Sequence, residues 1–261
     1  MGEPGPDNLQ LLIELARCPV VVAHYQTRRQ GACASVIASQ GAHDLNSHQV
    51  PEPWNGDLAH AGIVFVSSNP SINAVERYPT SSWSNPLIID FFQHRFGGGL
   101  EPWTAHTLRP LLRDGTHAPG WVRFWAAVRA RSSELLGRSA VPGSDYAITE
   151  IVHCKSDSEL GVSAAEEFCA DLYLRRVIAA SSAPVLVVMG DVAGRQIRRV
   201  FKLPADGRLH GPLEVGGSQR LFSFLPHPNA RKHRTFATCF DAASFTSLRQ
   251  HLSRGTQWTN T

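Results

Sequence analysis

The stretch that decides the fold is APVLVVMGDVAG, residues 183–194. Its apolar run is short and rich in β-branched residues, which predicts a buried β-strand. Asp191 is typical of a helix N-terminus, so we expect a helix over residues 191–201. A buried strand that leads directly into a helix indicates a parallel sheet covered by helices on both faces.

The same alternation of strand and helix recurs along the chain. Further strands are predicted at residues 62–67, 146–152 and 220–225. Apolar residues at helical spacing predict the other helices at residues 7–17, 85–96, 120–138, 163–180 and 240–253. We therefore expect an α/β fold, a three-layer αβα arrangement around a central four-stranded, mostly parallel sheet. The 261 residues are expected to form one domain (1–261) with a loop-rich insert around residues 25–60.

The composition narrows the class of protein. Hydrophobic residues make up 43% of the chain and charged residues 18%, which is typical of globular proteins. No apolar run is long enough to span a bilayer and the N-terminal residues do not resemble a secretory signal, so we expect a cytoplasmic protein with no membrane contact. No obligate protein partner is indicated. The formal net charge of +3 suits an anionic partner without requiring one.

Three unusual segments follow predicted strands: SSNPS (67–71), EIVHC (150–154) and PHPNARK (226–232). Parallel sheets bind ligands beyond the carboxyl ends of their strands, so these segments are expected at one functional edge. Glu150 is the most unusual residue among them. A carboxylate in a buried strand is costly unless another group pairs with it.

The first and last segments resemble motifs of the uracil-DNA glycosylase superfamily. SSNPS resembles the G-x-N-P-G motif of the mismatch-specific and single-strand-selective members, with Ser67 in place of the first glycine. His227-Pro228-Asn229 resembles the H-P-S motif. The strands between them resemble those of the iron–sulfur, thermophile-type members. The resemblance covers residues 7–240 and implies the fold and the DNA glycosylase activity of that superfamily, while the insert has no counterpart.

The resemblance also implies roles for individual residues. Asn69 would hold the attacking water below the sugar, and His227 would donate a hydrogen bond to the base oxygen where negative charge accumulates. The base must leave the duplex, and Trp83 lies where the iron–sulfur members carry a stacking phenylalanine. Contacts to DNA are expected from Ser68, Ser71, Asn229, Arg231, Lys232 and Arg234. The alternative interpretation makes Asn69 a turn former and His227 a structural cap.

Glu150 indicates which base the expected glycosylase would excise. Uracil-specific members carry asparagine at the matching position, and an amide both donates and accepts, whereas an ionised glutamate only accepts. Glu150 therefore favours an amino-bearing base, most simply cytosine, and a carboxyl protonated by burial would also donate to the ring nitrogen. The alternative is a structural ion pair with a nearby Arg or His. No aromatic residue follows Pro70 to close the space beside the 5-position, which favours a 5-modified cytosine such as phage hydroxymethyl- or glucosyl-hydroxymethylcytosine and suggests anti-phage defence.

Five cysteines without a secretion signal argue against a disulfide framework and favour buried thiols or a metal site. Cys154 and Cys169 resemble the second cysteine pair of the iron–sulfur members, and Cys18 stands where their first pair begins. The resemblance implies a structural [4Fe–4S] cluster, whose fourth ligand could be Cys33 or His24. Free buried thiols are the alternative. Hydrolysis itself needs no cofactor.

Taken together, these features predict a monofunctional DNA glycosylase. No lysine stands at a matched catalytic position, so we expect hydrolysis to an abasic site. One alternative is a repair glycosylase for uracil or another deaminated base. Two further alternatives belong to other functional classes: a non-catalytic DNA-binding sensor and a small-molecule hydrolase. The hydrolase would lack salt-dependent affinity for DNA.

Overall fold

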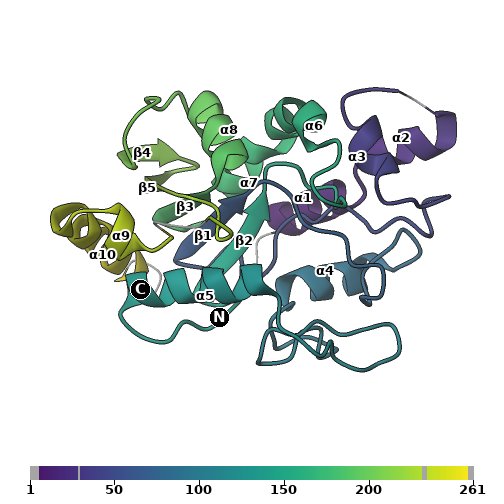
Figure 1. Cartoon of the computed structure of the whole chain (residues 1–261), viewed down its shortest axis with the longest axis horizontal. Coiled ribbons are helices and arrows are strands. Elements are labelled where there is room, and N and C mark those ends of the chain that lie inside the picture. Colours follow the sequence, from purple (N-terminus) through teal and green to yellow (C-terminus); the bar gives the residue numbers. More distant parts are fainter. Residues whose placement is uncertain (1–5, 29, 231–233, 258–261) are drawn as a thin grey trace.

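The computed structural model describes residues 6–28, 30–230 and 234–257. Its centre is a five-stranded sheet in the order β2-β1-β3-β5-β4 (Figure 1). The strands are β1 (Ile63–Ser67), β2 (Tyr146–Glu150), β3 (Val185–Met189), β4 (Leu209–Val215) and β5 (Ser218–Leu225). The first four strands in that order are parallel, whereas β4 runs antiparallel to β5.

The predicted α/β class with a mostly parallel sheet is confirmed, but the predicted count of four strands is wrong. The strand that the prediction missed is β4, which lies at the edge of the sheet and has one neighbour. Its residues are mostly half-buried or exposed, and its register with β5 shifts between His210 and Leu213. An edge strand of this kind lacks the continuous apolar run that marks the central strands.

Helices cover both faces of the sheet. Their bounds are α1 (Pro6–Ala16), α2 (Pro19–Thr27), α3 (Ala34–Ala38), α4 (Asn85–Gln93), α5 (Arg123–Leu136), α6 (Val162–Cys169), α7 (Arg175–Ala180), α8 (Asp191–Phe201), α9 (Phe236–Cys239) and α10 (Ala242–Gln257). The helix predicted over residues 163–180 is interrupted by a π-helical turn, η1 (Ala170–Leu174). The insert over residues 25–60 is not loop throughout, because it holds α3 and the end of α2.

Two hydrophobic cores lie on opposite faces of the sheet, because alternate residues of a strand point to opposite sides. Val64 and Val66 of β1 belong to one core, which packs against α1, α4, α6 and α8. Ile63 and Phe65 of the same strand belong to the other, which packs against α5, α9 and α10. Figure 1 shows α5 on one side of the sheet and α6 and α8 on the other, the three layers that the sequence predicts.

No described helix combines the length and the apolar character needed to cross a bilayer. The parallel strands all end at the same edge of the sheet. The segments that follow β1, β2, β3 and β5 therefore meet there, and they include the three unusual segments of the sequence.

Candidate functional site

A cavity of about 630 Å³ opens at the carboxyl ends of the parallel strands. Asn69, Glu150 and His227 all line it, although they come from loops or strand ends far apart in the sequence. The predicted DNA contacts that also line it are Ser68, Ser71 and Asn229. The structure thus brings together most of the site residues that the sequence indicates.

Asn69 is held by the loop that follows β2. Its Nδ2 donates to Ser156 Oγ at 2.7 Å and to the Pro70 carbonyl at 3.1 Å. The two loops are also joined by a backbone hydrogen bond from Ile72 to Ser156. Because the N–H groups are engaged, the Oδ1 acceptor, which meets no donor among the described residues, is available to a water. No sequence pattern indicated the orienting role of Ser156.

His227 lies half-buried between two prolines. The backbone N–H of Asn229 donates to His227 Nδ1 at 3.2 Å, so the proton of the neutral ring is on Nε2. Burial lowers the pKa of His227 below its ordinary value, and the charge of Glu159 opposes this only in part. Gly190 permits the close approach of this ring, since its φ is +84° and an added Cβ would lie 3.3 Å from His227 Cβ. The site therefore presents a neutral imidazole with an Nε2–H donor.

Glu150 is the last residue of β2 and only 3% exposed. Burial raises its pKa well above the ordinary value, the nearby Glu52 raises it further, and a hydrogen bond with Ser67 works in the opposite direction. Its Oε2 has no hydrogen-bond partner and it forms no ion pair within the described residues. The ion pair considered from the sequence is therefore not observed, and burial disfavours the charged form of this carboxyl.

Glu159 is a functional candidate that the sequence did not reveal. It lines the cavity, accepts a hydrogen bond from Ser68 Oγ at 2.5 Å, and acts on the pKa values of both Glu150 and His227. Its φ of +59° and that of Ser158, +52°, are rare for residues with side chains. Such backbone conformations cluster at functional sites. The Ser68 hydroxyl is thus engaged by Glu159 in this structure.

The far end of the cavity carries four more buried charged residues, Glu52, Glu76, Arg95 and Lys155. Lys155 Nζ lies 3.4 Å from Glu76 Oε2 and 3.8 Å from the centre of the Tyr78 ring. Burial lowers the pKa of Lys155, and the two carboxylates oppose that effect. None of these residues could be predicted from the sequence. They come from the insert, from either side of α4 and from the loop after β2, and no local sequence pattern indicates that these segments meet.

Trp83 does not line this cavity, so its predicted stacking role there is not supported. It borders a second cavity and packs against Phe91 and Trp103, with ring centroids 6.0 and 5.6 Å apart. The aromatic residues that line the first cavity are Phe124 and Trp125 of α5. The Phe124 ring is nearly parallel to that of His227, at 22° and 6.1 Å between centroids.

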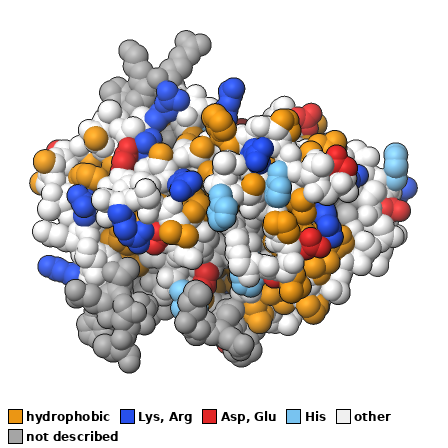
Figure 2. All heavy atoms as spheres, turned by 90° about the horizontal axis from the view of Figure 1, so that it is seen from below, with side chains coloured by type: hydrophobic (Ala, Val, Ile, Leu, Met, Phe, Trp, Pro, Cys, Tyr) orange, Lys and Arg blue, Asp and Glu red, His pale blue; other side chains and the backbone are white. Residues whose placement is uncertain are grey.

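The predicted contacts Arg231 and Lys232 lie outside the described residues. Arg234 Nη1 donates to the Pro228 carbonyl at 3.3 Å, and together with Arg123 and Phe124 it lines a hollow beside the mouth of the site. Figure 2 views the molecule from below, the side along which α5 runs in Figure 1. Lys and Arg side chains are spread over this face with hydrophobic side chains between them.

Four buried cysteines line one small apolar cavity: Cys18, Cys33, Cys154 and Cys169. Burial and the neighbouring thiols raise the pKa of Cys154, and the same causes raise that of Cys33 to about 11. No three His, Cys, Asp or Glu side chains among the described residues are close enough to hold a single metal ion. A four-iron cluster spans more space than one ion and takes four thiolates. The four cysteines supply the number of thiols that such a cluster takes, and Cys33, not His24, borders the cavity as the fourth.

No family model matches the chain, and no curated protein matches it significantly.

Proposed function

We propose that this protein is a monofunctional DNA glycosylase that hydrolyses the N-glycosidic bond of a flipped, cytosine-type base, most simply a 5-modified cytosine of phage DNA, and leaves an abasic site. The observation that carries the proposal is the grouping of Asn69, Glu150 and His227 around one cavity at the carboxyl edge of the sheet. The motif resemblance supports it independently. A role in anti-phage defence would follow from the same substrate.

In the proposed reaction, the bond between C1′ and the base nitrogen breaks, and its electron pair leaves with the base. A water then adds to the cation-like C1′, held there by its hydrogen bond to the free Oδ1 of Asn69. The proton that this water releases passes to the solvent or to the Glu159 carboxylate. The leaving base is stabilised by the Nε2–H of His227, a fixed donor aimed at developing negative charge.

Glu150 would read the polar edge of the base. In its neutral form the carboxyl hydroxyl donates to the ring nitrogen of cytosine, while the carbonyl oxygen accepts from the exocyclic amine. If the neutral carboxyl rotates so that its two oxygens exchange places, its carbonyl oxygen accepts from the N–H of uracil and its hydroxyl donates to the uracil carbonyl. The raised pKa of Glu150 therefore also favours our second candidate, a repair glycosylase for uracil or another deaminated base.

DNA would approach the mouth of the cavity. Arg123 and Arg234 flank the mouth and would contact phosphates, as would the hydroxyl of Ser71. Trp121, next to the cavity-lining Val122, is 64% exposed and offers a surface on which a base can stack. A non-catalytic DNA-binding sensor would use the same contacts without the chemistry.

The deciding experiment incubates the protein with DNA that carries uracil, cytosine, hydroxymethylcytosine or glucosyl-hydroxymethylcytosine, followed by alkali. We expect strand breaks at a modified cytosine, lost in Asn69→Ala and His227→Ala. Asn8→Ala is the matched control, because Asn8 bonds the Ala180 carbonyl far from the cavity. Breaks at uracil alone would favour the repair enzyme, and salt-dependent DNA binding without breaks would favour the sensor.

We also propose that the four cysteines hold a [4Fe–4S] cluster. When bound, such a cluster would tie α6, the loop after β2 and the N-terminal helices together. Hydrolysis of a glycosidic bond transfers no electrons, so the role would be structural.

A further inference from the structure

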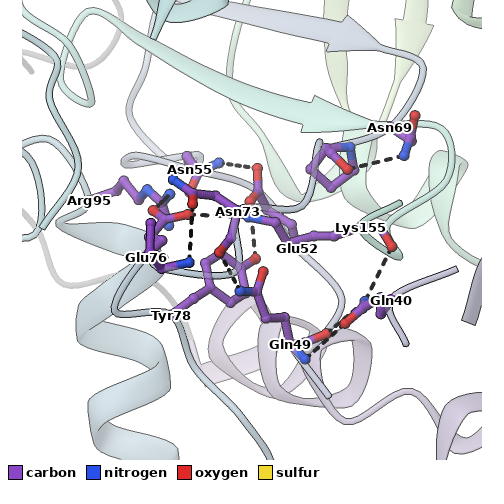
Figure 3. Close-up of polar contacts among 12 residues, drawn as sticks. Gln40, Gln49, Glu52, Asn55, Asn69, Asn73, Glu76, Tyr78, Arg95 and Lys155 are labelled. Atoms are coloured by element: carbon purple, nitrogen blue, oxygen red, sulfur yellow. Dashed lines mark hydrogen bonds and ion pairs between the residues drawn. The ribbon is translucent and has the colours of Figure 1, made fainter. Parts of the chain in front are cut away.

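The far end of the cavity forms a polar wall that the proposed reaction leaves unused. It consists of Glu52, Asn73, Glu76, Arg95 and Lys155. All but Asn73 are at most 5% exposed. Figure 3 shows Asn69 on one side of this group and Glu76 and Arg95 on the other, with Glu52 and Asn73 between them. The wall therefore reaches from the side of Asn69 to Glu76 and Arg95.

The charged groups of the wall are paired with each other only in part. Arg95 and Lys155 both bind Glu76, and Glu52 accepts a hydrogen bond from Tyr78 at 3.0 Å. Arg95 Nε and Nη1, however, are buried and find no acceptor among the described residues. An unpaired buried donor is costly, and part of that cost is offset by the rings of Phe91 and Trp125, whose centroids lie 4.3 and 5.0 Å from Arg95 Cζ. The wall therefore brings to the cavity charged groups that are only partly paired with each other.

The cavity is also larger than its proposed base requires. Cavities of roughly 300–1,000 Å³ hold drug-sized molecules, and this one measures about 630 Å³. A pyrimidine is a single six-membered ring. Beyond the base, space therefore remains for a substituent that extends toward the polar wall.

The charges of the wall define the chemistry of that substituent. An anionic group would meet the carboxylates of Glu52 and Glu76, and a cationic group would meet Arg95 and Lys155. A hydroxyl group both donates and accepts, so it can bind either kind of residue. The pattern therefore favours a neutral group with several hydroxyls.

We propose that Glu52, Asn73, Glu76, Arg95 and Lys155 form a subsite for a neutral, hydroxyl-rich substituent of the target base, such as a hexose, and that this subsite sets the specificity. The inference rests on the proposed glycosylase function. It assigns to the site a binding step that Asn69, Glu150 and His227 do not provide.

The test compares DNA with hydroxymethylcytosine and DNA with glucosyl-hydroxymethylcytosine as substrates. We expect the wild type to excise the glucosylated base at the higher kcat/KM. Glu76→Gln should lower the ratio of the two kcat/KM values roughly 10-fold or more, since it removes a charged acceptor of sugar hydroxyls. Asn73→Leu, a change at a half-buried position that keeps the size of the side chain, should lower the ratio in the same direction without the folding risk of a buried charge.

Glu14→Gln is the matched control, because it removes the carboxylate of an exposed Arg–Glu pair on α1. Thermal melting of each variant separates loss of fold from loss of specificity. Equal kcat/KM values for both substrates in the wild type, or an unchanged ratio in both subsite variants, would overturn the subsite and leave the glycosylase intact. If no base is excised, the equilibrium binding of the two DNAs to the protein tests whether the subsite exists. A preference for glucosylated DNA that Asn73→Leu abolishes would support the subsite although the enzymatic function had failed, and no preference would overturn both.

Discussion

Replacing Glu150 with glutamine tests the electrostatics of the site most directly. The substitution keeps the shape of the side chain but removes the ionisable proton. Glu150 is 3% exposed and its Oε2 meets no donor among the described residues, so ionisation in the folded protein is unfavourable. We expect Glu150→Gln to be more stable than the wild type at neutral and alkaline pH.

The sign and size of the stability difference between the two proteins follow from the linkage of proton binding to folding. The pKa of Glu150 is raised in the folded state above its ordinary value of 4.5. Its contribution to stability is therefore fully present below pH 4.5 and is lost as the pH rises through the folded pKa. Over that window the wild type should lose up to about 1.4 kcal/mol per pH unit relative to the variant. For a chain of this size the melting temperatures should diverge by roughly 3–6 °C per pH unit.

The assay is urea or thermal unfolding of both proteins at pH 5, 6, 7 and 8. All other titrating groups are shared, so the difference between the two curves isolates Glu150 and the groups coupled to it. Glu166→Gln is the control, because Glu166 is also buried but is paired with Arg195 at 3.1 Å, and its loss should destabilise the protein. A Glu150→Gln variant that is less stable than the wild type at pH 8 would refute the reasoning, since it would mean that Glu150 is ionised and paired.

Further predictions concern the chemistry and the cofactor. His227→Ala should slow excision by roughly 10²–10³-fold in single-turnover assays, as for other donors to a developing anion. Gly190→Ala should slow excision because its Cβ would press on His227, whereas Gly217→Ala, which has the same kind of positive φ but open space around it, should leave the rate unchanged. Purified protein should contain the iron and sulfide of one four-iron cluster, and Cys33→Ser should lose both. Borohydride should trap no covalent adduct with DNA, because Lys155 is held in an ion pair; a trapped adduct would make the enzyme a lyase.

The sequence predicted the central sheet and the residues at its carboxyl edge for one physical reason. Parallel strands buried on both faces must be apolar and short, so residues 62–67 and 183–190 stand out, and polar residues just beyond them must meet at one edge. The segments that hold Asn69, Glu150 and His227 were therefore expected at one edge, whereas the roles of Asn69 and His227 came from the motif resemblance.

The polar wall could not be found in this way. Glu52 comes from the insert and Arg95 from just after α4, and neither position has a local pattern that distinguishes it from a solvent-exposed charge. Trp83 shows the reverse case, because a motif position predicted a stacking role at the site, whereas its side chain borders a second cavity and packs against Phe91 and Trp103. Long-range packing decides which side chains reach a cavity, and spacing along the chain does not record it.

The π-helical turn η1 has a consequence for how this chain tolerates insertions and deletions. A π-helical turn holds one residue more than an α-helical turn, and one residue corresponds to about 100° of rotation. Cys169 before it and Val177 after it both face the same core. Deleting one residue from Ala170–Leu174 would restore an ordinary α-helix but rotate one of these faces out of the core. Substitution at the exposed Leu172 should be tolerated where a deletion is not, so the length of this segment is more constrained than its composition.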